Sequence, residues 1–99
     1  MDRNGYNPSI LGDYAFCAIC GKNGPLQRHE VFHGANRPKS KKYGLWISIC
    51  PSCHSIIHNS DGALDRRLKR QAQEQAQTVY GWSTAEFRLI FGKNYREDE

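Results

Sequence analysis

A pair of Cys-x-x-Cys motifs constrains this chain more than any other feature. Cys17 and Cys20 form the first motif, Cys50 and Cys53 form the second, and 29 residues separate the two. A two-residue gap lets both sulfurs of a motif reach one tetrahedral ion at about 2.3 Å, and a second motif completes the thiolate shell. The spacing predicts a structural zinc site, because four thiolates leave no coordination position for water.

Two other interpretations of the cysteines stay open. Two disulfides could form with three possible connectivities, although nothing marks the chain as secreted and a reducing compartment keeps thiols free. A redox role for one motif would leave the other motif unexplained. Spacing and context favour zinc.

Length and composition bound the fold. The chain has 99 residues, 38% of them hydrophobic, so we expect one domain over residues 1–99 whose thin core benefits from a metal. No stretch approaches the roughly 20 apolar residues of a membrane span, and the N-terminal residues lack the order of a secretory signal. These features predict a soluble, cytoplasmic protein with no membrane partner.

The net charge of +4 is unevenly distributed. All of the excess lies before residue 59, since residues 59–99 carry seven charges of each sign. The basic run over residues 37–42 suits a polyanion, although a short basic run is often only a solvated loop. The residues expected to contact phosphates are Arg28, Arg37, Lys39, Lys41 and Lys42.

Hydrophobic patterning predicts a small α+β domain. Residues 26–32 and 45–49 are expected as strands, joined by a loop over residues 34–44 that is rich in Gly, Pro, Asn, Lys and Ser. A helix is expected from Pro51 to about His58, because proline is tolerated in a first helical turn. These elements form a zinc-framed unit over residues 15–59.

Residues 60–99 are expected to add a helical extension. Apolar residues from Leu64 to Val79 recur at helical spacing, with Gly81 as a stop. Ser83 and Glu86 form a capping box that begins a short last helix. The basic side chains at positions 66, 67, 69 and 70 are expected to form a solvated face rather than a longer DNA track.

Four aromatic residues are expected in or near the core. Tyr14 and Phe16 should mark its beginning, and Tyr43 and Trp46 are expected to pack in the core in preference to stacking on bases.

All four histidines lie between or beside the cysteine motifs. His54 and His58 are four residues apart on the expected helix, which places both imidazoles on one face. His29, on the first strand, would supply a third ligand, and three protein ligands with open positions are typical of a catalytic metal. Alternatively, one or more of the histidines pairs with neighbours or replaces a cysteine ligand.

The order of these motifs resembles the treble-clef-like ββα-metal finger of HNH endonucleases. The resemblance covers residues 17–58 and is carried by His29-Glu30 on a strand, Asn36 in a loop, a second strand and CPSCHSIIH on a helix. The small size and helical tail are also similar to short HNH proteins of phages and prophages. The resemblance implies a metal-dependent endonuclease that binds DNA and hydrolyses phosphodiester bonds.

The resemblance also implies roles for individual residues. His29, His54 and His58 would hold a divalent ion (Mg²⁺, Mn²⁺, Ni²⁺ or Zn²⁺) at the active site. Glu30 departs from the family, which usually has a base histidine there; a carboxylate can do that work, and His33 is a substitute base or a further ligand. The usual asparagine before the second strand is missing, so Asn36 would take its role or the role is lost.

Two rival functions remain from the sequence. The chain could be a non-catalytic zinc finger that binds DNA, with the chemistry lost at Glu30. It could also be a small module whose zinc supports a protein-binding surface, which predicts no salt-dependent DNA binding. A homodimer would make double-strand cleavage easier for a nuclease of this size.

Overall fold

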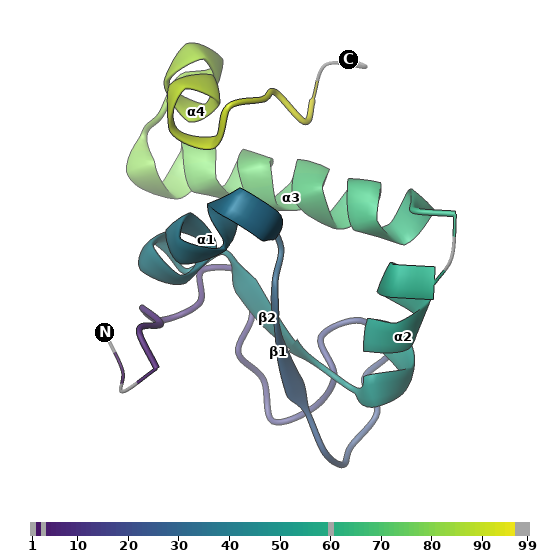
Figure 1. Ribbon diagram of the computed structural model, residues 1–99. Coiled ribbons are helices and arrows are strands. Elements are labelled where there is room, and N and C mark those ends of the chain that lie inside the picture. The colour runs from purple at the N-terminus through teal and green to yellow at the C-terminus, as the bar shows by residue number, and fades with distance from the viewer. Residues whose placement is uncertain (1, 3, 60, 97–99) are drawn as a thin grey trace.

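The computed structural model of the chain describes residues 2, 4–59 and 61–96, so the expected domain ends at residues 1 and 97–99 lie outside the described residues. Its elements are β1 (Gln27–Glu30), a 3₁₀ turn η1 (Gly34–Asn36), α1 (Arg37–Tyr43), β2 (Trp46–Ile49), α2 (Pro51–Asn59), α3 (Ala63–Tyr80) and α4 (Thr84–Phe91). In Figure 1, α1 and α2 lie at opposite ends of the small sheet. Helix α3 extends from the α1 end toward the α2 end, and α4 lies on the side of α3 that is remote from the sheet. The architecture is the expected small α+β fold with C-terminal helices.

The sheet consists of β1 and β2, which pair antiparallel. The register places Gln27 opposite Ile49 and His29 opposite Ile47. Successive side chains of a strand point to opposite faces, so Gln27 and His29 share one face while Glu30 lies on the other. Both strands fall within the ranges expected from the sequence.

The prediction of a loop over residues 34–44 is wrong, because this segment contains η1 and α1. Pro38 in the first turn and Gly44 as a left-handed C-cap are ordinary helix start and stop signals. The buried Ser40 hydroxyl accepts from the Phe32 N–H at 3.0 Å and donates to the Phe32 carbonyl at 2.7 Å. This pair of bonds fixes α1 against the chain that leaves β1.

The N-terminal segment packs along α1 and β2. The Asn7 N–H donates to the Lys41 carbonyl at 2.9 Å, and the Trp46 indole donates to the Asn7 carbonyl at 2.8 Å. The Ile10 N–H donates to the Gly44 carbonyl at 2.9 Å. The segment thereby packs against the face of β2 that carries Trp46, and all four residues of this strand are buried.

Gly44 is the tightest point of this packing. Its φ is +69°, and a Cβ there would lie 2.2 Å from the Pro8 carbonyl oxygen. We expect Gly44→Ala to lower the free energy of unfolding by about 3 kcal/mol, since both left-handed strain and a backbone clash must be relieved. Gly81 is the matched control, because it has the same φ with nothing within 4 Å. Gly81→Ala should cost about 1 kcal/mol in urea unfolding, and equal losses in the two variants would contradict the clash.

The core consists of two clusters. Val31, Phe32, Leu45, Phe87 and Phe91 belong to the first, with Ala72 and Ala76 of α3. The second contains Ile47, Ile49 and Ile57 together with three of the cysteines. The partly buried Leu68 packs against both, so α3 connects the two clusters.

Two of the four aromatic residues expected in the core are not there. Tyr14 and Phe16 are 48% and 42% exposed and stack on each other at 4.9 Å between ring centroids. They precede the Cys17/Cys20 motif at the surface, and the described elements leave both rings partly exposed. Trp46 is 3% exposed and Tyr43 packs against the first cluster, as expected.

The C-terminal helices confirm the capping prediction. The Glu86 N–H donates to the Ser83 hydroxyl at 3.1 Å and the Ser83 N–H donates to the Glu86 carboxylate at 3.0 Å.

None of the helices formed by the described residues has both the length and the apolar character that a membrane span requires.

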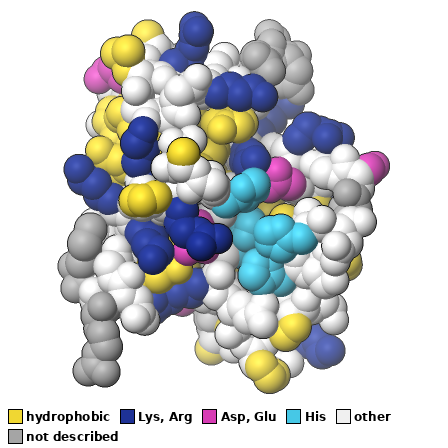
Figure 2. All heavy atoms as spheres, in the orientation of Figure 1, with side chains coloured by type: hydrophobic (Ala, Val, Ile, Leu, Met, Phe, Trp, Pro, Cys, Tyr) yellow, Lys and Arg dark blue, Asp and Glu magenta, His cyan; other side chains and the backbone are white. Residues whose placement is uncertain are grey.

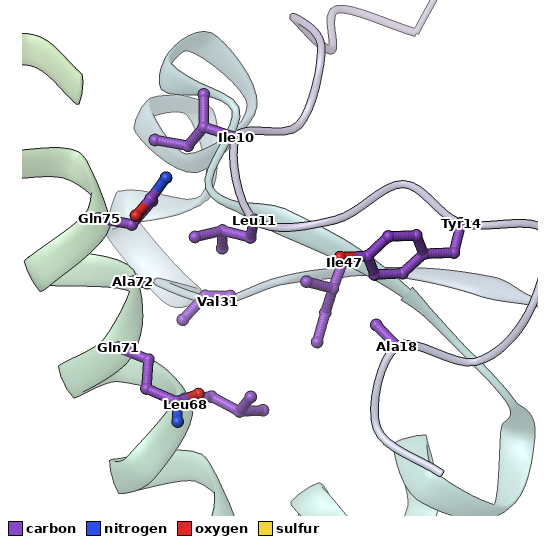
Figure 3. A pocket seen from close by; sticks show the side chains of 10 residues that line it. All are labelled: Ile10, Leu11, Tyr14, Ala18, Val31, Ile47, Leu68, Gln71, Ala72 and Gln75. Carbon is purple, nitrogen blue, oxygen red and sulfur yellow. The ribbon is translucent and has the colours of Figure 1, made fainter. Parts of the chain in front are cut away.

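A cleft of about 490 Å³ lies between α3 and the N-terminal segment (Figure 3). Ile10 and Leu11 form one wall, and Leu68, Gln71 and Gln75 of α3 form the other. None of the residues expected to bind metal or DNA lines this cleft.

Candidate metal centre

The four cysteines of the two motifs converge. One ligand atom from each lies within 4.8 Å of the others, and the sulfurs of Cys20 and Cys50 are 3.8 Å apart. This separation matches two sulfurs of a tetrahedral ion bound at about 2.3 Å and exceeds the disulfide bond length of about 2.05 Å. The cysteines are free thiols, which supports the metal interpretation over disulfides.

Backbone N–H groups point at the sulfurs in each motif. The Cys17 sulfur accepts from the Ile19 N–H at 3.4 Å, and the Cys50 sulfur accepts from the Cys53 N–H at 3.4 Å. Burial acts to raise the pKa of Cys17, but backbone donors from both motifs lower this pKa to about 6. Burial and the neighbouring sulfurs raise the pKa of Cys53. A cation offsets this unfavourable crowding of thiolates, so the cluster suits a structural metal such as zinc.

Three histidines form a second cluster beside the first. His29 of β1 and His54 and His58 of α2 each offer a nitrogen within 4.8 Å of the others. His29 is 2% exposed, and its Nε2 has no hydrogen-bond partner in the described part of the chain. In Figure 2 the histidines gather on one face, next to Lys and Arg side chains. A buried, unpartnered nitrogen on a residue of a histidine cluster fits a metal ligand.

The electrostatics of this cluster favour the neutral form of two imidazoles, those of His29 and His54. Burial and the charges of the other three histidines lower the pKa of His29 to about 4. Burial and His58 also lower the pKa of His54. Neutral imidazole is the form that binds a metal, so both rings are ready to act as ligands at pH 7.

Comparison with known proteins gives no match: no family model, no curated protein and no solved structure matches this chain. The chemistry of the two clusters is therefore interpreted from their own residues.

His33 flanks the three-histidine cluster. Its ring centroid lies 6.3 Å from those of His29 and His58, and its Nε2 lies 3.4 Å from a carboxylate oxygen of Asp65. Asp65, in the first turn of α3, also pairs with Lys69 at 2.9 Å. Sequence reasoning did not find Asp65, because no local pattern links a residue of α3 to the chain that follows β1.

Glu30 lies on the opposite face of β1 and is engaged there. The Tyr6 hydroxyl donates to its carboxylate at 2.6 Å, and Arg37 Nε lies 3.7 Å from the same oxygen. Burial acts to raise the pKa of Glu30, but the Tyr6 hydrogen bond and the Arg37 charge hold the pKa below its usual value. Glu30 is therefore ionised and already paired at neutral pH.

Asn36 forms a hydrogen bond with the end of α4. Its side-chain amide donates to the Phe91 carbonyl at 3.0 Å, at the last residue of α4. This bond connects η1 to α4, and the structure does not bring the Asn36 amide into the three-histidine cluster.

Three of the five basic residues expected to bind DNA gather around Tyr6. Arg28 lies over the Tyr6 ring at 4.4 Å, and Lys41 lies over the same ring at 4.8 Å. Arg37 approaches the Glu30 carboxylate that Tyr6 binds. We call Arg28, Arg37 and Lys41 the basic triplet; Arg28 also pairs with Asp2 at 2.9 Å.

The other two basic residues of the run point elsewhere. Lys39 donates to the Ile90 carbonyl near the end of α4, and Lys42 lies 5.3 Å from the centroid of the Tyr43 ring. On α3, Lys69 pairs with Asp65 and Arg70 pairs with Glu74 at 3.8 Å. Arg66 and Arg67 are exposed, as expected for a solvated face, but the Lys69 side chain is only 16% exposed and lies 5.7 Å from the Tyr95 ring centroid, so this part of the expectation is wrong.

Proposed function

We propose that the chain is a metal-dependent DNA endonuclease of the HNH type. The observation that carries the proposal is a cluster of three histidines beside a separate four-cysteine cluster. His29 of this cluster has a lowered pKa and a buried nitrogen with no partner among the described residues, and His54 also has a lowered pKa. The cysteines suffice for a structural zinc, so the histidines are left for a second ion with open positions.

In this proposal the histidines bind a divalent ion, which would stabilise negative charge on the scissile phosphodiester. His29, His54 and His58 fix the position of the ion from two elements, β1 and α2. Mg²⁺, Mn²⁺, Ni²⁺ and Zn²⁺ remain candidates, because imidazole ligands accept several of these metals and availability decides among them.

His33 is the better-placed base of the two candidates. Its Nε2 faces Asp65, so Nε2 carries the proton of the neutral ring and Nδ1 is left to accept a proton from water. The Glu30 carboxylate already accepts from Tyr6 and pairs with Arg37. These contacts lower its basicity, so we assign the base role to His33.

Replacement of the base is expected to slow cleavage. His33→Ala should lower the rate of DNA nicking by at least about 10²-fold, the usual loss when a general base is removed. Glu30→Gln should have a much smaller effect, since it keeps the size of a side chain that is bound to Tyr6. Single-turnover nicking at saturating metal measures both. A large loss in Glu30→Gln with none in His33→Ala would reverse the assignment.

The basic triplet is proposed to bind the phosphates that flank the cleaved bond. Its side chains surround Tyr6 and Glu30, and Glu30 is the direct neighbour of the metal ligand His29 in β1. Phosphate contacts by Lys and Arg provide affinity that falls with salt and carry little sequence information.

Substitutions should separate the two groups of basic residues. We expect Arg37→Gln and Lys41→Gln each to weaken duplex binding and to reduce the slope of log K against log[salt] by about 1. Lys39→Gln removes the same charge, but the Lys39 side chain is directed to α4. The salt slope of this variant should therefore stay near that of wild type. Fluorescence anisotropy over a salt series measures the slopes. Equal slopes for Lys39→Gln and Lys41→Gln would contradict phosphate binding by the basic triplet.

A second candidate function is a non-catalytic DNA-binding finger. The observation that favours it is the engaged state of Glu30, which stands where the family usually has its base. This candidate predicts one tight zinc per chain, salt-dependent DNA binding and no cleavage.

A plasmid-nicking assay tests the proposal. Protein stripped of loosely held metal is supplied separately with Mg²⁺, Mn²⁺, Ni²⁺ or Zn²⁺, and conversion of supercoiled to open-circular DNA is followed. We expect nicking with at least one metal and none with chelator. Absence of nicking under every metal, with DNA binding retained, would favour the non-catalytic finger.

A further inference from the structure

Gln27 contacts one of the three clustered histidines directly. Its side-chain oxygen lies 2.6 Å from Nδ1 of His54. Gln27 precedes His29 by two residues on β1, so strand alternation places both side chains on the face that meets α2. One strand therefore presents a histidine and a hydrogen-bond acceptor to the same cluster.

The contact determines which nitrogen of His54 carries the proton. An amide oxygen only accepts hydrogen bonds, so Nδ1 of His54 must donate. A neutral imidazole has one N–H, and with the proton on Nδ1 the lone pair lies on Nε2.

We propose that Gln27 is a positioning residue of the metal site, which holds the His54 ring so that Nε2 faces a divalent cation. The inference rests on the proposed three-histidine metal site and adds a residue outside its ligands. Histidines that bind metals usually donate their other ring N–H to an oxygen, and loss of that oxygen weakens metal binding.

The surroundings of the contact favour this role over a purely structural one. Gln27 is exposed and His54 is half-buried, so their hydrogen bond competes with water and contributes little to folding. The His54 ring lies 4.8 Å from that of His58 and 5.4 Å from that of His29, between centroids. At such close range a rotation of the ring would move its nitrogen away from the shared centre.

Metal titration tests the role. Zinc-loaded protein is titrated with Co²⁺, and binding to histidines is followed by visible absorbance and by calorimetry. Absence of thiolate-to-cobalt charge-transfer bands shows that Co²⁺ has not replaced the zinc. We expect Gln27→Leu to bind Co²⁺ about 10- to 100-fold more weakly than wild type. Gln27→Glu keeps an acceptor oxygen and should retain affinity within a few-fold. Gln75→Leu, an exposed glutamine on α3, is the matched control and should not differ from wild type.

The ring nitrogens provide a readout that does not need bound metal. In metal-free histidine sites, ¹⁵N shifts should show the Nδ1–H tautomer of His54 in wild type and a mixture of tautomers in Gln27→Leu. Wild-type protein that takes up no Co²⁺ beyond its zinc would overturn the proposed metal site and the inference with it. Equal Co²⁺ affinities and unchanged ¹⁵N shifts in Gln27→Leu would overturn the role of Gln27 alone.

Discussion

Removal of zinc from the four-cysteine cluster is expected to unfold the chain. Structural zinc sites in small peptides bind with roughly 10 to 16 kcal/mol, whereas whole domains are stable by about 5 to 15 kcal/mol. Cys17, Cys50 and Cys53 are 5% exposed or less and pack with Ile47, Ile49 and Ile57. Without a cation to bind them, these buried sulfurs would no longer hold the segments of the second core cluster together. Circular dichroism during titration with a strong chelator should show loss of helix together with zinc release.

The comparison that tests this expectation uses one variant in each cluster. Cys50→Ser should reproduce the unfolding without chelator, because it removes a buried ligand from the strand end that leads into α2. His58→Ala should keep one zinc per chain and the wild-type helix content, since His58 is exposed. A zinc-free chain with the wild-type unfolding midpoint would show that the apolar core suffices alone.

Parts of both clusters were accessible from the sequence because their spacing is local, whereas the meeting of the two cysteine motifs, and of His29 with α2, joins segments that are about 25 to 30 residues apart. The two-residue gap of each Cys-x-x-Cys motif lets both of its sulfurs bind one ion, and histidines four residues apart share a helix face wherever the helix lies. The capping box of α4 was accessible for the same reason, as Ser83 and Glu86 are three residues apart. Patterns of this kind depend on a few neighbouring residues and do not require knowledge of the tertiary fold.

The features missed by the sequence depend on contacts between distant segments. Asp65 reaches His33 from another element, and Tyr6 reaches Glu30 across 24 positions of the chain. Both contacts arise from the way α3 and the N-terminal segment pack, which no periodicity reports.

The error at α1 has a different cause. Its Gly, Pro, Asn and Ser content suggested a loop, yet the same proline and glycine also mark the start and stop of a short helix. Tertiary bonds through Ser40 decide between the two, since they hold the helix against Phe32.

Replacement of one cluster histidine is expected to abolish nicking by the proposed nuclease. His58→Ala should reduce the rate by at least about 10⁴-fold, since a bound ion supplies several kcal/mol of transition-state stabilisation and each 1.36 kcal/mol is tenfold. His58 is the most informative of the three ligands to replace, because it is exposed near the end of α2 and its loss should leave the fold intact. The assay is plasmid nicking with the metal that best supports the wild-type protein.

Ile56→Ala is the matched control for this experiment. Ile56 lies two residues earlier in α2 and is 51% exposed, so its truncation makes a similar change on the same helix without removing a ligand. The control should nick at the wild-type rate, and both variants should retain one zinc. If His58→Ala nicks as fast as Ile56→Ala, the three-histidine cluster is not the catalytic centre. The cleavage would then have to depend on groups elsewhere, and the basic triplet variants would show whether DNA still binds around Tyr6.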